Sequence, residues 1–136
     1  MLELSIITAE KTIFKGMVTS VTVPTVTGEI GILTGHRPLI GKLDVGGIRL
    51  VNEDKSEEIV FVAGGFVQID DNKVAILADT AENLEAIGLE QAVEARKKAE
   101  QMLLESTDEI NAEKLKAELR MMLIREKLAQ ISKYKK

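Results

Sequence analysis

The chain has 136 residues, 45% of them hydrophobic and 29% charged, with a net charge of −4 at neutral pH. This length suits one domain with a real core plus an appendage. The acidic balance and the 3% aromatic content disfavour a nucleic-acid-binding protein, which needs a basic patch and stacking surfaces. The absence of cysteine excludes disulfides, thiolate catalysis and thiolate metal sites.

No secretory signal is expected, because the N-terminus carries no basic segment followed by a long apolar one. The longest apolar run, residues 59–67, is far short of the about 18 residues that a membrane-spanning helix requires. We therefore expect no direct membrane insertion, and other subunits would hold the protein at any membrane where it acts.

The first part of the chain is predicted to form β-strands. Short segments rich in β-branched residues alternate there with polar turns, a pattern typical of a sandwich or a flattened barrel. The predicted strands are residues 2–8, 11–14, 17–24, 39–43, 47–51, 58–62, 66–69 and 73–78.

Residues 27–39 interrupt this pattern with three glycines, one proline and the only histidine of the chain. Glycine tolerates positive φ and close backbone approach, so we expect a shaped loop here. The spacing of Gly28, Gly31 and Gly35 does not match a dinucleotide loop. A phosphate loop is also excluded, because five residues separate Gly35 from Gly41 where four are required, and Leu43 replaces the Ser or Thr that would bind magnesium. His36 alone cannot build a His-rich metal site or a Ser-His pair, and we expect it to brace the loop. No catalytic or metal-binding constellation is predicted.

The pattern changes to helix-forming residues near residue 80. Residues 89–105 and 111–132 predict two helices, and the capping residues between them predict an antiparallel hairpin. The second helix has apolar residues on two faces. Either both faces pack within the chain, or one of them binds a partner. The same helix has more basic than acidic residues, which fits a solvated face or an acidic partner.

Several motifs in this order resemble the ε-subunit family of bacterial F-type ATP synthase, equivalent to the δ subunit of the mitochondrial enzyme. They are Gly28-Glu29-Ile30-Gly31-Ile32-Leu33, Gly35-His36, Ala63-Gly64-Gly65-Phe66-Val67-Gln68-Ile69, Val74-Ala75-Ile76-Leu77-Ala78-Asp79-Thr80-Ala81-Glu82 and Ala95-Arg96-Lys97-Lys98-Ala99-Glu100. The resemblance implies an antiparallel β-sandwich of about ten strands over residues 1–80, a linker over 81–88, and a regulatory helical hairpin over 89–136.

The resemblance also implies a non-catalytic rotor subunit of the central stalk, which couples proton translocation to ATP synthesis. Its partners would be the γ subunit and the ring of c subunits, and its place the cytoplasmic face of the energy-transducing membrane. The contact to the c ring would fall to Gly28, Glu29, Gly31 and His36. A different function remains open from the residues alone, namely a separate adaptor that binds an acidic protein.

The hairpin is implied to inhibit ATP hydrolysis when it extends into the α/β catalytic hexamer, with Arg120, Arg125 and Lys127 as contacts. Some members of the family bind ATP through an Ile-Asp-x-x-Arg-Ala motif, where this chain has a glycine for the acid and a glutamine for the arginine. We therefore expect weak or absent ATP binding and no other cofactor. The remnants of that site would be Glu82, Ile87, Gln91, Ala92 and Lys98.

Overall fold

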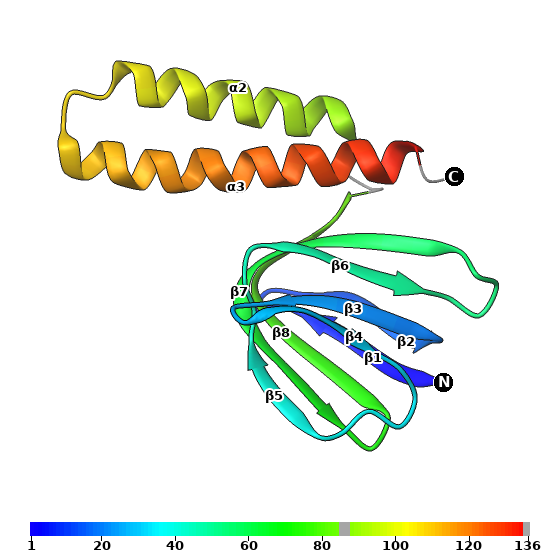
Figure 1. Cartoon of the computed structure of the whole chain (residues 1–136). Helices are drawn as coiled ribbons and strands as arrows, with labels where there is room; N and C mark the ends of the chain where they lie inside the picture. Colours follow the sequence, from blue (N-terminus) through cyan, green and yellow to red (C-terminus); the bar gives the residue numbers. More distant parts are fainter. Residues whose placement is uncertain (85–87, 135–136) are drawn as a thin grey trace. The chain divides into compact units, whose positions relative to one another are not determined.

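The computed structural model describes residues 1–84 and 88–134, and the chain divides into two compact units, Met1–Asn83 and Leu84–Lys136 (Figure 1). The described residues of the first unit form eight strands, and those of the second form two helices. The strands are β1 (Leu2–Ile7), β2 (Thr12–Val18), β3 (Ser20–Thr25), β4 (Gly28–Ile32), β5 (Leu39–Lys42), β6 (Gly46–Val51), β7 (Glu57–Asp70) and β8 (Lys73–Asn83). The helices are α2 (Leu89–Glu105) and α3 (Glu109–Tyr134).

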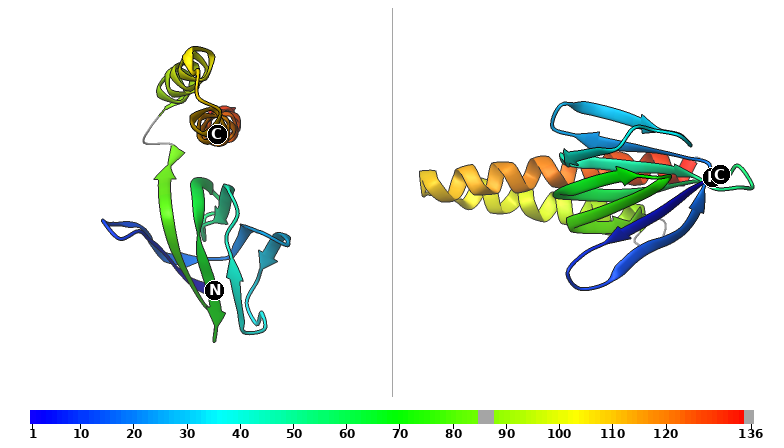
Figure 2. Two further views of the ribbon diagram at one scale, coloured as in Figure 1. Left: turned by 90° about the vertical axis from the view of Figure 1, so that its left-hand side faces the viewer. Right: turned by 90° about the horizontal axis from the view of Figure 1, so that it is seen from below.

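The strands pair in the order β2-β1-β8-β7-β6-β3-β4, and β5 pairs with β7 outside this path. Among the described strands, every pair is antiparallel except β1 with β8, which is parallel. The curvature of this sheet is visible in Figure 2. The predicted class, a β-sandwich followed by two helices, is confirmed, with eight described strands where about ten were expected.

Strand β7 connects the two parts of the sandwich. It is 14 residues long and pairs with β8 from Val60–Asn83 to Asp70–Lys73. Its first half also pairs with β6 and its second half with β5, so one long strand is hydrogen-bonded to both. We predicted two strands here, at 58–62 and 66–69, because Gly64-Gly65 looked like a break. The structure corrects this, since both glycines have positive φ, 81° and 113°, within one continuous strand.

Gly65 is fixed by its surroundings as well as by its backbone. A side chain at this position would overlap the carbonyl oxygen of Leu77 and lie 2.7 Å from the Cα of Ala78, both on the neighbouring strand β8. Real Cβ atoms do not come so close to backbone. Glycine at 65 therefore allows β7 and β8 to stay paired where the sheet turns.

Two other boundaries differ from those predicted. The glycine-rich stretch is not wholly a loop, because residues 28–32 form β4 and pair with β3. The backbone N–H and C=O groups of β3 need hydrogen-bond partners on this side, and residues 28–32 supply them. The turn-forming residues of this stretch hid its strand character in the sequence. Strand β8 continues to Asn83, into the expected linker 81–88, of which residues 85–87 lie outside the described part of the chain.

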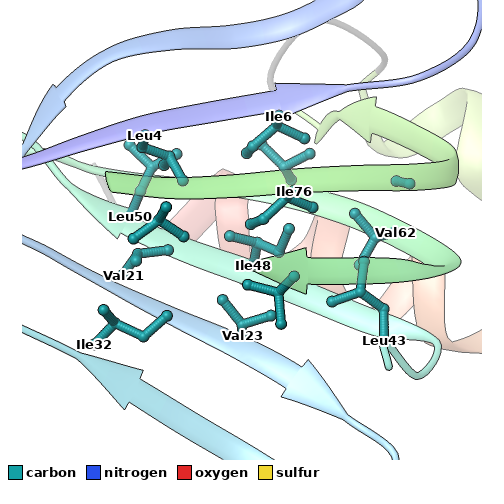
Figure 3. Close-up of a cluster of buried hydrophobic side chains, with 14 of the residues drawn as sticks. Leu4, Ile6, Val21, Val23, Ile32, Leu43, Ile48, Leu50, Val62 and Ile76 are labelled. Atoms are coloured by element: carbon teal, nitrogen blue, oxygen red, sulfur yellow. The ribbon is translucent and has the colours of Figure 1, made fainter. Parts of the chain in front are cut away.

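The core of the first unit is formed by alternating side chains that point inward from the strands. Figure 3 shows Leu4, Ile6, Ile48, Leu50 and Ile76 meeting from three different strands. Each of these side chains is completely buried. Burial of one aliphatic side chain of this size stabilises the fold by about 1.5–3 kcal/mol, so the sandwich has a sufficient core of its own.

The second unit is an antiparallel helical hairpin, as expected (Figure 1). Residues 106–108 connect the helices, and the Asp108 carboxylate accepts a hydrogen bond of 3.0 Å from the backbone N–H of Ile110, as an N-cap does. Small side chains are buried on both helices, Ala92 and Ala99 on α2 and Ala129 on α3. They let the two helices approach closely.

Candidate functional site

The turn between β3 and β4 is built around the buried side chain of Thr25. Its hydroxyl donates a hydrogen bond of 2.6 Å to the carbonyl oxygen of Gly28 and accepts one of 3.3 Å from the backbone N–H of Thr27. Gly28 has a φ of 120°, which a residue with a side chain rarely adopts. The turn thus holds the next residue, Glu29, in a fixed place, with its side chain exposed to solvent.

Gly31 differs from the other two glycines of this stretch. Gly28 and Gly35 need glycine because their φ values are 120° and 86°, whereas Gly31 does not lie in the positive-φ region. A Cβ added at Gly31 would meet no atom of the described residues within 4 Å. Gly31 is also exposed, on the strand that ends the sheet path. The fold of this unit therefore gives no reason for glycine at this position.

His36 lies in a separate turn that is anchored to distant parts of the chain. Its Nδ1 is 2.7 Å from the carbonyl oxygen of Arg37, so in the neutral ring Nδ1 carries the proton. The backbone N–H of Gly35 donates to the side-chain oxygen of Asn72 at 2.7 Å, and the N-terminal ammonium donates to the hydroxyl of Thr34 at 3.1 Å. These contacts fit the expectation that the histidine turn is braced.

The structure does not gather the four expected c-ring residues into one cluster. Gly28 and Glu29 lie beside the β3–β4 turn, at the start of β4, whereas His36 follows the other end of that strand. Gly28 and Ile32 are four residue steps apart along β4, about 13 Å at the usual rise per residue. Glu29 and Gly31 therefore share one side of β4, and His36 belongs to a neighbouring turn.

Exposed aliphatic side chains lie on both sides of β4 in the sequence, and the sequence reasoning did not single them out. Val26 precedes β4 and Leu33 follows it, and they are 56% and 64% exposed. Leu39 and Ile40 on β5 are also exposed. A usable signal was present, because Ile32 and Leu33 are adjacent in an extended segment. Neighbouring residues of a strand point to opposite faces, so one of the two had to face outward.

A second apolar surface lies on the outer face of the sheet. Ile7 of β1 is opposite Leu77 of β8, which in turn is opposite Phe66 of β7. All three side chains are exposed. Here too, the adjacent pair Ile76 and Leu77 indicated that β8 has apolar residues on both faces. We call Ile7, Leu77 and Phe66 the outer apolar row.

The three basic residues expected to act in inhibition do not share one surface of α3. Arg120 and Lys127 are exposed and seven residues apart, which is two turns and places them on the same face. Arg125 is turned about 140° from Arg120 around the helix axis and is buried, with polar contacts of its own.

The expected remnants of a nucleotide site are divided between the two units. Glu82 is half-buried on β8, while Gln91 and Lys98 are exposed on one face of α2. Ala92 is fully buried within the second unit. Ile87 lies outside the described residues. Within residues 1–84 and 88–134, no group of three acidic or histidine side chains could hold a metal ion.

One ionic cluster was missed by the sequence reasoning. Arg96 of α2 contacts Glu126 of α3 at 2.7 Å and Glu100 of its own helix at 3.0 Å. The hydrogen bond to Glu126, followed by that to Glu100, raises the pKa of Arg96 above its already high value. The guanidinium is therefore permanently charged in this setting.

No described helix is long and apolar enough to cross a membrane.

Comparison with known proteins supplies the family. Residues 1–84 match the model of the ATP synthase Delta/Epsilon chain, beta-sandwich domain. The chain is 40% identical over 121 residues to the ATP synthase epsilon chain of Bordetella petrii, covering 89% of this chain and 86% of that protein. It is equally 40% identical, over 119 residues, to ATP synthase epsilon chain 2 of Ralstonia nicotianae, covering 88% and 86%.

Solved structures agree with these matches. A chain of the Euglena gracilis mitochondrial ATP synthase, in a structure of OSCP, F1 and the c-ring, superposes with a TM-score of 0.78 at 26% identity, covering 93% of this chain and 80% of that one. A chain in the central stalk and c-ring structure of the Tetrahymena thermophila enzyme shares the fold, with a TM-score of 0.59 at 15% identity, covering 92% and 96%. The chain therefore belongs to the ATP synthase epsilon-chain family.

Proposed function

We propose that the chain is a non-catalytic rotor subunit of the central stalk of F-type ATP synthase and binds the c ring through the β3–β4 hairpin. Membership of the epsilon-chain family supports a place in the ATP synthase complex. The observation that carries the c-ring contact is Gly31, a glycine that the fold does not need, exposed on the edge strand next to Glu29.

The chemistry of this surface suits a contact with the polar loops of another subunit. Because Gly31 has no side chain, a partner's backbone can approach β4 closely there. The Glu29 carboxylate can accept charge-assisted hydrogen bonds from a basic loop residue, and these strengthen when the contact excludes water. The exposed side chains of Val26 and Leu33, just before and just after β4, add apolar area to this hairpin.

The outer apolar row is the surface we assign to the γ subunit. Ile7, Leu77 and Phe66 would each be covered by a partner, and burial of such side chains is favourable by about 1.5–3 kcal/mol each. Three aligned positions on three adjacent strands form a continuous surface, unlike the single exposed apolar residues that are common on proteins. The subunit would thereby rotate with γ, at the cytoplasmic face of the membrane and without inserting into it.

The helical hairpin would inhibit ATP hydrolysis by opening and inserting α3 into the α/β hexamer. Arg120 and Lys127 support this role because they present two positive charges on one face of α3. Arg125 would contribute only after a rearrangement that exposes it. Regulation by ATP would be weak or absent, since Gly88 and Gln91 replace the acid and the arginine of the family motif and cannot make their charge-assisted hydrogen bonds.

The c-ring contact is tested by Glu29→Lys in the assembled enzyme, with Glu53→Lys as a control at another exposed acid of the same unit. Reversal of the charge at 29 should reduce ATP-driven proton pumping while ATP hydrolysis continues. The control should leave the ratio of pumping to hydrolysis unchanged. Equal ratios for both variants would remove Glu29 from the contact.

Inhibition by the hairpin is tested by removing residues 111–136. The enzyme assembled with the shortened subunit should hydrolyse ATP faster than the enzyme with the full chain. An unchanged rate would mean that the hairpin has no inhibitory role.

A further inference from the structure

The two helices of the hairpin are joined by an ion pair between residues that are 30 positions apart in the sequence. Nε of Arg96 donates to Oε2 of Glu126 at 2.7 Å, and a second guanidinium nitrogen, Nη2, lies 3.4 Å from Oε1 of the same carboxylate. The contact is therefore two-pronged, the geometry in which arginine binds a carboxylate most strongly. The remaining nitrogen, Nη1, donates to Glu100 at 3.0 Å.

This pair lies on the inner faces of the helices. Ala92, Arg96 and Ala99 follow one another at spacings of four and three on α2, and both alanines are buried. Glu126 and the buried Ala129 are three residues apart on α3. The side chains of Arg96 and Glu126 are only 22% and 13% exposed, whereas those of the surface pair Lys116 and Glu113 are 60% and 78% exposed. Water therefore screens the inner pair much less than the surface pair.

We propose that Arg96 and Glu126 form a latch that keeps α2 and α3 together and so sets how often the hairpin opens. This inference deepens the proposed inhibition and rests on it, since the latch regulates the opening that inhibition requires. The geometry supports the latch, because the Arg96–Glu126 ion pair joins the two helices and is largely removed from water.

Because the Arg96–Glu126 pair is shielded from water, it affects the opening of the hairpin more than the overall stability of the chain. An apolar pair of similar size would hold the helices at least as well, since two charges lose their hydration when they are buried. Removal of Arg96 alone is strongly unfavourable, because the Glu126 carboxylate then stays shielded and uncompensated. The closed hairpin is thus more sensitive to the loss of the Arg96 charge alone than to the loss of both charges.

Glu100 gives the latch a defined open state. It lies one helical turn from Arg96 on the same helix, so this contact does not depend on α3. When the helices separate, Arg96 keeps the carboxylate of Glu100 and exchanges only Glu126 for water. Opening therefore breaks a single ionic contact instead of leaving the arginine without a partner.

The test uses the full chain, whose lack of cysteine allows two cysteines to be introduced for spin labels, Lys97→Cys on α2 and Glu118→Cys on α3. Both positions are exposed, and the distance between the labels reports separation of the helices. Arg96→Gln should increase the population with the longer distance by at least about tenfold, because the Glu126 carboxylate loses its partner. The matched control, Glu113→Gln, removes the surface pair and should leave the distances unchanged.

Two combined variants separate the latch from general damage to the hairpin. Arg96→Glu with Glu126→Arg restores the pair in reverse and, with Glu100→Gln added so that position 96 faces no like charge, should return the short distance. Arg96→Met with Glu126→Leu should keep the hairpin closed despite the loss of both charges. Unchanged distances in Arg96→Gln, or opening in the charge-reversed variant equal to that in the single variant, would overturn the latch.

The same variants in the assembled enzyme distinguish the latch from the proposed inhibition. If both hold, Arg96→Gln lowers ATP hydrolysis, and the apolar pair keeps it at least as fast as in the enzyme with the unsubstituted chain. If the distances change as expected in the isolated chain but hydrolysis does not, the latch stands and the inhibitory role of the hairpin is wrong. If the distances do not change, the latch is wrong whatever hydrolysis does.

Discussion

Replacement of Gly65 by alanine tests the role assigned to the glycine pair in β7. At a φ of 113°, alanine is strained, and its Cβ would overlap the backbone of Leu77 and Ala78 on β8. The strain alone costs about 1–3 kcal/mol. Relief of the overlap requires β7 and β8 to move apart along a pairing that extends over most of both strands.

Together these effects predict a loss of about 3–5 kcal/mol, the range of the most disruptive single substitutions. Domains of this size have a total stability of about 5–15 kcal/mol, so the variant should lose a large share of its free energy of unfolding. Gly31→Ala is the matched control, since its Cβ meets none of the described atoms within 4 Å and its φ is not in the positive region. It should change the stability by less than about 1 kcal/mol in either direction.

Urea unfolding of the full chain, followed by circular dichroism at a wavelength dominated by strand, measures both variants. With a denaturant slope of about 1–3 kcal/mol per molar, the midpoint for Gly65→Ala should fall by at least about 1 M. Hydrogen exchange of peptides from β7 and β8 should show the loss locally, while peptides from α3 keep their protection. Equal midpoints for the two variants would refute the steric reasoning.

Three further predictions test other parts of the structure. Ile76→Ala removes a fully buried side chain and should destabilise the sandwich by about 2–5 kcal/mol, whereas the exposed Ile40→Ala should change it by less than about 0.5 kcal/mol, both measured by urea unfolding. Thr25→Val removes the hydroxyl that binds the Gly28 carbonyl and should cost about 1–3 kcal/mol, with faster hydrogen exchange in residues 26–32; unchanged exchange would contradict this role. The hydroxyl of Ser56, followed by its backbone N–H, lowers the pKa of Asp54, so the resulting stabilisation is present above the ordinary pKa and is lost as pH falls through the lowered one. Asp54→Asn should therefore flatten the acid side of a curve of stability against pH, and an unchanged acid slope would show that the Asp54 contact has no effect.

Local patterns in the sequence were sufficient for the class of the fold. Strand segments rich in β-branched residues and the change to Ala, Glu, Lys and Leu near residue 89 are read from neighbouring residues, and α2 has the predicted bounds. The parallel pairing of β1 with β8 was beyond such reasoning, because it joins segments about 70 residues apart and leaves no local trace.

The errors at glycines have a common cause. Glycine is frequent both in loops and at bends inside strands, and local sequence does not tell which applies. Gly64 and Gly65 looked like an interruption, although their positive φ values lie within a continuous strand. Gly28 and Gly31 looked like a loop, although they belong to an edge strand.

The residues of the candidate site were predicted, but their positions relative to one another were not. The sequence and the family resemblance named Glu29 and His36, while their placement at different ends of β4 depends on how the strand is paired. The Arg96–Glu126 pair could have been suspected, because Ala92, Arg96 and Ala99 share the inner face of a predicted helix. Its partner residue depended on the register of the hairpin, which the sequence alone does not determine.

The most direct test of the rotor contact is crosslinking in the assembled enzyme in its membrane. A photoreactive amino acid at position 29 is compared with one at position 55, an exposed site in the turn between β6 and β7. Illumination should join the first variant to a c subunit and leave the second without that product. Crosslinking of both variants to c at equal yield, or of neither, would contradict the assignment of the β3–β4 hairpin to the c ring. A chain that does not purify with γ and c at all would favour the alternative of a separate adaptor.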